Sequence, residues 1–201
     1  MKRIGLFICC LLFSLTILAQ GDTHLKFMGI PITGTISQFQ SKLTQKGCTY
    51  DKSTNASFPA GSRAFKGTFI GYKVDIYAYY DTKTKIVYRV KAVINGTSED
   101  LAEQYYSNIK SLLSQKYGTD FMLTDTKEDK ECVSFLSLKN RNDNVDLSSQ
   151  SLSEVANGTI DLFITQDEET WIRSPYNYNV HIDYNDFVNS DKHSNQQLDE
   201  I

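Results

Sequence analysis

Residues 72–94 read YKVDIYAYYDTKTKIVYRVKAVI, and two runs of alternating apolar and polar residues flank the polar segment DTKTK. Alternation with a period of two is typical of antiparallel strands that bury one face. We therefore predict a hairpin in which residue 80 lies opposite residue 86. This register pairs, across the two strands, Ile76 with Val90, Val74 with Ala92, Asp75 with Lys91 and Tyr77 with Arg89.

Three later segments are also predicted to be strands: 131–138 (ECVSFLSL), 157–165 (NGTIDLFIT) and 176–184 (YNYNVHIDY). In the last segment, tyrosines and aliphatic residues share one face, whereas His181 and Asp183 lie on the other. The stretch 140–150 (NRNDNVDLSSQ) is polar and is predicted to be a loop.

Two predicted helices lie in the two copies of a weak internal repeat. Residues 32–47 read ITGTISQFQSKLTQKG and residues 94–118 read INGTSEDLAEQYYSNIKSLLSQKYG, so each copy begins Ile-x-Gly-Thr and ends at a glycine. Thr35 followed by Gln38 has the form of a capping box, and Thr97 with Asp100 offers a close variant. In the second helix we predict that the buried side consists of Leu101, Tyr105, Ile109, Leu112, Leu113 and Tyr117.

These elements predict an α+β fold built from two tandem helix-plus-antiparallel-meander units, about 24–95 and 96–188, in a two-layer sandwich. Residues 20–188 would form one domain, with the helices on one face of the sheet. Residues 189–201 (NSDKHSNQQLDEI) offer little to bury and are predicted to be a flexible tail.

The N-terminus predicts export. Lys2 and Arg3 precede the uncharged apolar run 4–18 (IGLFICCLLFSLTIL), which is typical of a signal peptide cleaved after Ala19. The alternative is an uncleaved anchor, but the run is short for a membrane span, which needs about 20 residues. We expect a periplasmic or secreted protein with no stable membrane span after cleavage.

Cleavage of 19 of the 201 residues would leave 182. Lys and Arg would fall from 21 to 19 against 24 acidic residues, which gives a net charge of −5. This charge argues against nucleic acid as a partner, since phosphate binding needs clustered cations. Cys48 and Cys132 would be the remaining cysteines, either as a disulfide or as two separate buried thiols.

The sequence contains no strong catalytic, cofactor-binding or metal-ligand motif, such as GxSxG, a phosphate-binding glycine loop or HExxH. His181 and Asp183 could form an acid–base pair in a hydrolase with an unrecognised site, but we favour the interpretation that they belong to a solvated polar strand face with Asn177 and Asn179. The run Asp167, Glu168 and Glu169 lacks the alternate spacing of a calcium loop, and we interpret it as a charged turn.

Aromatic residues favour a binding function. Tyr77, Tyr79 and Arg89 are predicted on the sheet face that no helix covers, and Trp171 could join them from the loop before the last strand. Tyr, Trp and Arg dominate binding hot spots. The alternative is that strands simply favour aromatic residues and that Trp171 fills the core.

Three segments resemble a group of small exported proteins of gut Gram-negative anaerobes with no characterised function: 24–47 (HLKFMGIPITGTISQFQSKLTQKG), 65–80 (FKGTFIGYKVDIYAYY) and the helix that ends KYG at Gly118. The doubled layout is also similar in architecture to the β-lactamase inhibitor proteins and to small outer-membrane assembly factors. An inhibitor of that type binds with its concave sheet face, which implies Tyr77, Tyr79 and Arg89 here. Neither group implies catalytic residues.

We therefore expect a non-enzymatic binding module without a cofactor, whose partner is another exported or envelope protein. An envelope-assembly accessory protein and a hydrolase are the alternatives.

Overall fold

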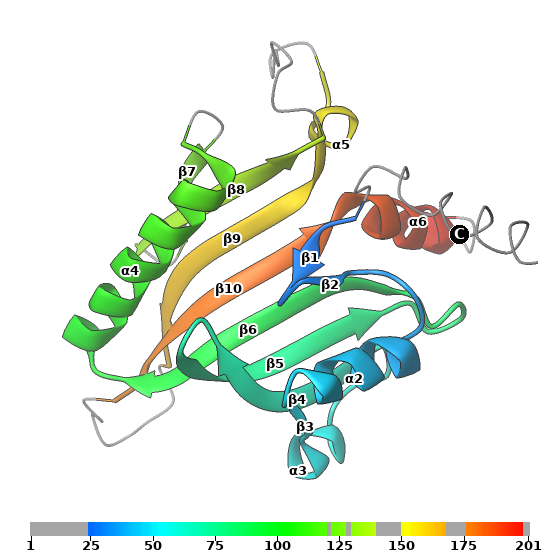
Figure 1. Ribbon diagram of the computed structural model, residues 1–201, viewed down its shortest axis with the longest axis horizontal. Helices are drawn as coiled ribbons and strands as arrows, with labels where there is room; N and C mark the ends of the chain where they lie inside the picture. The colour runs from blue at the N-terminus through cyan, green and yellow to red at the C-terminus, as the bar shows by residue number, and fades with distance from the viewer. Residues whose placement is uncertain (1–23, 120–121, 128–129, 140–149, 168–175, 199–201) are drawn as a thin grey trace, which may run out of the picture.

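The computed structural model describes residues 24–119, 122–127, 130–139, 150–167 and 176–198. These residues confirm the α+β prediction, since they form five helices, an eight-stranded antiparallel sheet and a two-stranded ribbon (Figure 1). Among them, no helix has both the length and the apolar composition needed to cross a membrane. The predicted loop at 140–150 lies outside the described residues except for its last position.

The elements have the following bounds. The strands are β1 Lys26–Phe27, β2 Ile30–Pro31, β3 Thr49–Tyr50, β4 Ser62–Phe69, β5 Tyr72–Tyr80, β6 Val87–Thr97, β7 Met122–Lys127, β8 Lys130–Leu138, β9 Ala156–Gln166 and β10 Tyr178–Asp186. The helices are α2 Ile36–Gln45, α3 Lys52–Asn55, α4 Glu99–Tyr117, α5 Leu152–Val155 and α6 Phe187–Leu198.

The large sheet has the strand order β3-β4-β5-β6-β10-β9-β8-β7. Strands β3 to β6 follow α2 and β7 to β10 follow α4, so the two groups of strands meet where β6 pairs with β10. That α2 with β3 to β6 and α4 with β7 to β10 are tandem copies of one unit, stacked as a two-layer sandwich, stays a prediction.

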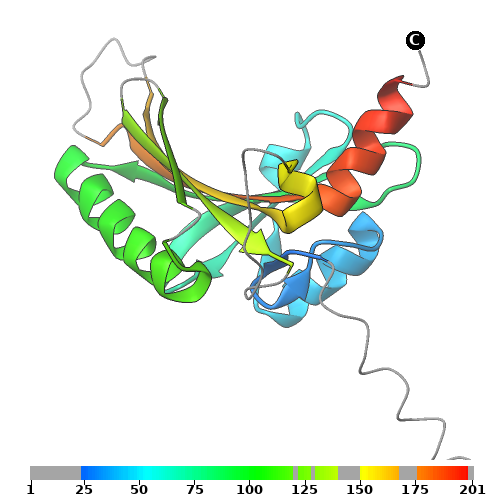
Figure 2. The same ribbon diagram turned by 90° about the horizontal axis from the view of Figure 1, so that it is seen from above.

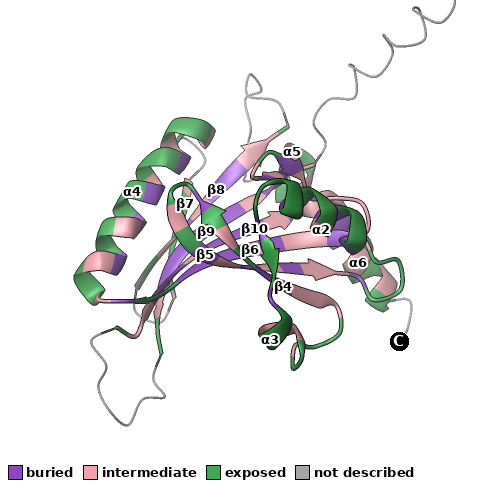
Figure 3. Cartoon of the chain, turned by 60° about the horizontal axis from the view of Figure 1, so that its bottom comes forward, coloured by how far each residue is buried: buried purple, intermediate pink, exposed green. Residues whose placement is uncertain are grey.

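The main core lies between the sheet and helices α2 and α4, which pack on the same face (Figure 2). Helix α2 buries Ile36, Phe39 and Leu43 there, and Figure 3 shows the exposed outer sides of both helices. The predicted capping box of α2 is confirmed, because Thr35 Oγ1 accepts from the amide of Gln38 at 3.4 Å and Gln38 Oε1 accepts from the amide of Thr35 at 2.9 Å.

Helix α4 begins one residue later than the sequence predicts. Its predicted buried side is confirmed at Ile109 and Leu113 but differs at other positions. Ser98 rather than Thr97 caps the helix, because β6 extends through Thr97. The buried residues are Ala102, Tyr106, Ile109 and Leu113, whereas the predicted core residue Leu112 is 47% exposed. The hydroxyl of Tyr106 donates to Glu131 at 2.9 Å, so this tyrosine can be buried with its polar atom satisfied.

The β5–β6 hairpin forms with the predicted faces but in a register shifted by two residues. Ile76 lies opposite Ala92, and Tyr79 rather than Tyr77 lies opposite Arg89. A two-residue shift preserves which side chains share a face, because the side-chain period of a strand is two. The register also changes between Tyr79 and Tyr80, and with this irregularity Val87 lies in the core.

No disulfide joins Cys48 to Cys132. Cys48 is buried directly before the edge strand β3, and Cys132 lies in β8, so β4, β5, β6, β10 and β9 separate them in the sheet. Neighbouring strands are about 4.8 Å apart, which puts the two sulfur atoms far beyond disulfide reach. The alternative prediction of two separate buried thiols agrees with the structure for Cys48, whereas Cys132 is only partly buried.

The prediction of a flexible tail is wrong for residues 189–198, which form most of α6. Asn189 is buried, and its side-chain amide donates to the backbone carbonyls of Ile32 at 2.9 Å and Val87 at 3.1 Å. His193 stacks on Tyr88 with ring centroids 4.4 Å apart. A few polar contacts and one aromatic contact therefore dock a helix that has almost no apolar stripe.

Asp81 links α6 to the β5–β6 turn. Its carboxylate is 2.9 Å from His193 Nδ1 and accepts from the backbone and hydroxyl of Thr84 at 2.6 and 2.9 Å. Burial disfavours ionisation of Asp81, but the hydrogen bonds from Thr84, His193 and Lys83 outweigh it and lower its pKa to about 2.

We expect Asp81→Asn to lower the free energy of unfolding by about 1–2 kcal/mol at neutral pH. The pKa of Asp81 is lower in the folded protein than in the unfolded chain. The stability that its ionised carboxylate contributes is therefore present above the unfolded pKa near 4 and is lost as the pH falls toward 2. The deficit of the variant in urea unfolding should therefore shrink over that range. Asp191→Asn on the exposed side of α6 is the matched control, and an equal deficit at all pH values would contradict the argument.

Candidate functional site

The sheet face opposite α2 and α4, called the outer face here, carries the predicted binding residues. Tyr77 and Tyr79 project from β5, Arg89 from β6, and His181 and Asp183 from β10, while their strand neighbours enter the core. Of the predicted site residues, only Trp171 lies outside the described residues.

Arg89 is held in one position by two neighbours. Its Nε donates to Asp183 at 2.8 Å, its second terminal nitrogen also bonds that carboxylate, and its guanidinium carbon lies 5.1 Å from the centroid of the Tyr79 ring. The hydrogen bond to Asp183 raises the pKa of Arg89 above its usual value, so the guanidinium stays charged. Asp183 is only 3% exposed, so the pair is a buried acid beneath a half-exposed base.

The described contacts of His181 are with β9. Its Nε2 lies 2.7 Å from the hydroxyl of Thr165, and its ring stacks on Phe163 with centroids 4.7 Å apart. Asp183 instead bonds Arg89 across the β6–β10 pairing. The residues proposed for a hydrolase therefore have separate structural partners.

An open hollow of about 330 Å³ lies on the outer face, and we call it the aromatic hollow. Its lining includes Phe58, Tyr77, Tyr79, Lys91, Asn179 and His181. Phe58, from the segment after α3, contacts Tyr77 with ring centroids 5.4 Å apart. Burial raises the pKa of Tyr77 and Tyr79, which keeps both phenols neutral near neutral pH.

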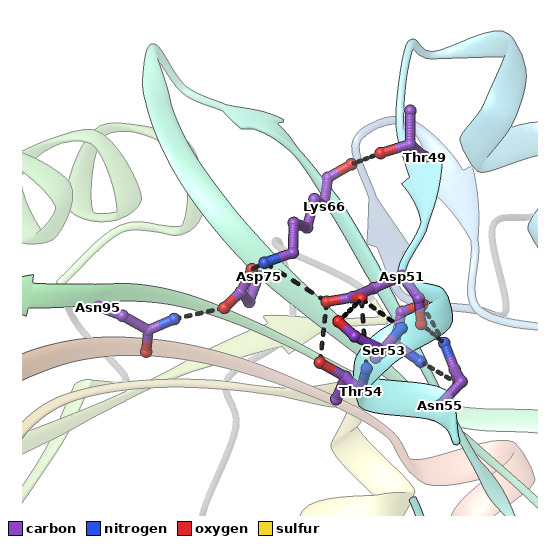
Figure 4. Close-up of polar contacts among 9 residues, drawn as sticks. Thr49, Asp51, Ser53, Thr54, Asn55, Lys66, Asp75 and Asn95 are labelled. Carbon is purple, nitrogen blue, oxygen red and sulfur yellow. Dashed lines mark hydrogen bonds and ion pairs between the residues drawn. The ribbon is translucent and has the colours of Figure 1, made fainter. Parts of the chain in front are cut away.

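A second open hollow of about 510 Å³ continues toward the β4 edge and shares Val93 and Asn95 with the first. A network of polar side chains lies beside this second hollow (Figure 4). Lys66 Nζ lies 3.6 Å from Asp75 and 3.4 Å from Asp51, and Asn95 donates to Asp75 at 2.7 Å. The two hollows make one depression along β5 and β6.

Asp51 anchors the edge of that network. It caps α3 by accepting from the hydroxyl and the amide of Ser53 and from those of Thr54, at 2.7 to 3.2 Å. These hydrogen bonds lower its pKa below the ordinary range for aspartate. Its carboxylate therefore stays charged beside Lys66.

The outer face is less open than the sequence predicts. The side chain of Asn55 bonds both backbone groups of Ala64 and holds the α3 segment at the edge of β4, and Phe58, which follows α3, packs on Tyr77 on the outer face. Val93 and Phe163 are 3% and 5% exposed, although they lie on this face. The surface that remains is therefore formed by tyrosines, charged groups and amides around the aromatic hollow.

No protein-family model, curated protein or solved structure matches this chain. The resemblances to exported proteins of gut anaerobes and to β-lactamase inhibitor proteins accordingly stay predictions. Among the described residues, no three histidine, cysteine, aspartate or glutamate side chains gather as a metal site would require.

The sequence predicts that Tyr77, Tyr79 and Arg89 lie on this face, as they do, but it does not predict the positions of Phe58 and Asp183 beside them. The signal for Phe58 was a single aromatic residue within the polar segment 51–57 (DKSTNAS). The signal for Asp183 was a lone carboxylate on the same predicted face as Arg89, and recognising it requires knowing that β6 and β10 are neighbours.

Proposed function

We propose that this protein is an exported, non-enzymatic binding module that recognises another exported or envelope protein with its outer face. The observation that carries this proposal is the aromatic hollow, which is lined by Tyr77, Tyr79 and Phe58. Arg89 lies next to it, with its guanidinium over the Tyr79 ring. Tyrosine and arginine contribute much binding energy at interfaces because they bury large areas with few rotatable bonds.

Preorganisation of the outer face supports the proposal. The Asp183 carboxylate and the Tyr79 ring already hold Arg89, so binding a partner would order few side chains. Lower ordering costs leave more of the contact energy as affinity. A rigid charged group beside open aromatic rings is therefore suited to recognition.

The shape of the face favours a protein over a small ligand. The two hollows join along β5 and β6, and both are open to solvent rather than enclosed. A small-molecule site usually surrounds most of its ligand, whereas a protein partner covers a broad, shallow surface. Export is supported by the charged start and the apolar run of residues 1–19, and a mature N-terminus at Gln20 tests it.

The binding test uses a Tyr77→Ala, Tyr79→Ala double variant. We expect the wild-type chain from Gln20 onward to capture a specific protein from envelope extract, and the purified pair to bind at least about tenfold more weakly with the variant. Arg89 is kept, because its removal would leave the buried Asp183 without its partner and would destabilise the fold.

Tyr105→Ala is the matched control, because Tyr105 is a half-buried tyrosine on the opposite side of the molecule, in contact with Tyr72. It should leave the affinity unchanged. Equal affinity of the wild type and the double variant for the purified partner would refute the proposed face.

A further inference from the structure

The depression on the outer face is elongated along β5. Every second residue of this strand enters the core, so four side chains lie on the outer face: Lys73, Asp75, Tyr77 and Tyr79. The first two line the second hollow and the last two line the aromatic hollow. At about 3.4 Å per residue, roughly 20 Å separate the two ends of this row, which is the length of about six residues of extended polypeptide.

One end of the depression suits an aromatic side chain. The aromatic hollow is lined by Phe58, Tyr77 and Tyr79, and its volume of about 330 Å³ exceeds that of any single side chain. The rings of Phe58 and Tyr77 are tilted by 31°, so a third ring can meet them in the offset or edge-on contacts that aromatic groups prefer. Within the described ranges, no hydrogen bond is made by the hydroxyl of Tyr77 or Tyr79, so both are available to a ligand.

The other end of the depression has a lysine without a counter-ion. The charged groups that line the second hollow are Lys66, Lys73 and one carboxylate, Asp75. Lys66 is already 3.6 Å from Asp75 and 3.4 Å from Asp51. Among the residues that the structure describes, Lys73 has no ion pair, and Thr68 lies opposite it in the β4–β5 pairing. A carboxylate in this hollow would therefore meet an uncompensated ammonium group and a hydroxyl.

The two residues that line both hollows suit the backbone of a peptide. Val93 is 3% exposed and lies between the two ends, whereas Asn95 is exposed. The amide nitrogen of Asn95 donates to Asp75 at 2.7 Å, which fixes this side chain beside the depression (Figure 4). Its Oδ1 is then left to accept a hydrogen bond from a backbone N–H of a ligand.

We infer that the depression binds an extended segment of the partner, with an aromatic residue in the aromatic hollow and an aspartate or glutamate four positions away, beside Lys73. Side chains four residues apart in an extended chain face the same side and are about 14 Å apart, which is the spacing of Lys73 and Tyr77 along β5. The inference rests on the proposed binding function of the outer face, and it narrows the partner to a protein with such a segment.

Selection from a phage library of random twelve-residue peptides on the immobilised chain from Gln20 onward tests the inference. We expect one enriched family, in which Phe, Tyr or Trp lies four positions from Asp or Glu. The Tyr77→Ala, Tyr79→Ala double variant should not enrich this family, because it lacks the rings that receive the aromatic residue.

Reversing the charge of Lys73 tests the acidic position. Selection on Lys73→Glu should keep the aromatic residue but replace the acidic residue four positions away by Lys or Arg. Lys42→Glu is the matched control, because Lys42 is an exposed lysine of α2, on the opposite side of the sheet. It should select the same family as the wild type does.

Affinities of one enriched peptide, measured by fluorescence polarisation, isolate the charged contact. Lys73→Gln should weaken binding by about threefold to tenfold, and changing the acidic residue of the peptide to its amide should weaken binding to the wild type equally. The amide peptide should bind Lys73→Gln and the wild type alike, because the contact is already absent in both cases.

The inference would be overturned by an absence of enriched peptides, by a family without the acidic position, or by the same family on Lys73→Glu. It would also fall if oligosaccharides on a glycan array bound the wild type but not the double variant while no peptide did. A purified partner that binds the wild type and not the double variant, without any enriched peptide, would leave the proposed function intact and reject only the extended segment.

Discussion

Replacing Gly158 with alanine should lower the free energy of unfolding by more than about 3 kcal/mol. A Cβ atom at this position would lie 2.2 Å from the backbone carbonyl oxygen of Asn185 and 3.2 Å from a methyl group of Leu25. Gly158 is in β9 opposite Asp186, so relief requires that β9 and β10 separate where they pair. Urea unfolding followed by circular dichroism measures the loss.

Gly67→Ala is the matched control for this prediction. Gly67 also lies within a strand, but the atom that a Cβ would meet is the Cys48 sulfur at 2.7 Å, on a side chain rather than on backbone. A side chain can move at lower cost, so the control should lose less stability. Equal losses in the two variants, or a Gly158→Ala protein as stable as the wild type, would show that the β9–β10 contact is not as tight as described.

The second large effect is expected from Asp186→Ala, which should cost about 3–5 kcal/mol of unfolding free energy. Asp186 is fully buried, and its carboxylate accepts from the amides of Leu25 at 2.7 Å and Asn189 at 3.0 Å. His24 Nδ1 lies 3.1 Å from the same group. Alanine would leave these buried donors without an acceptor, and it would detach the N-terminal ribbon and the start of α6 together.

Asp186→Asn tests the contribution of the hydrogen bonds at this site, because it changes them while the size of the side chain stays the same. Asparagine has the same shape but one acceptor oxygen instead of two, so it can serve Leu25 or Asn189 but not both. We expect its loss in thermal or urea unfolding to be intermediate. If Asp186→Ala were no less stable than Asp186→Asn, the hydrogen bonds would not be the source of the stability.

Much of the fold could be predicted from the sequence because it depends on local periodicity. The alternation in 72–94 predicted the hairpin and its two faces, and Thr35 with Gln38 predicted the start of α2. The register failed by two residues, because both registers bury the same side chains and the irregularity at Tyr79 and Tyr80 has no local signal. Pattern alone does not distinguish registers that preserve the faces.

The remaining differences come from tertiary contacts. Tyr106 can be buried because Glu131 of a strand distant in sequence satisfies its hydroxyl, whereas Leu112 is exposed. The helix α6 has weak apolar character, and the buried side chain of Asn189 docks it onto carbonyls far away in the chain. The candidate site was predictable as far as Tyr77, Tyr79 and Arg89 lie on one face of the β5–β6 hairpin, whereas Asp183 joins them only through the pairing of β6 with β10.

The central position of β10 has a consequence for how the chain folds. This strand comes after every other strand of the sheet in the chain, yet it pairs with β6 on one side and β9 on the other. Until residue 186 is available, β6 and β9 are open edges that can pair with other chains. Native assembly therefore depends on sequence-distant pairing, which is slow and exposes intermediates to aggregation, and a chaperone that binds the incomplete sheet should raise its folding yield.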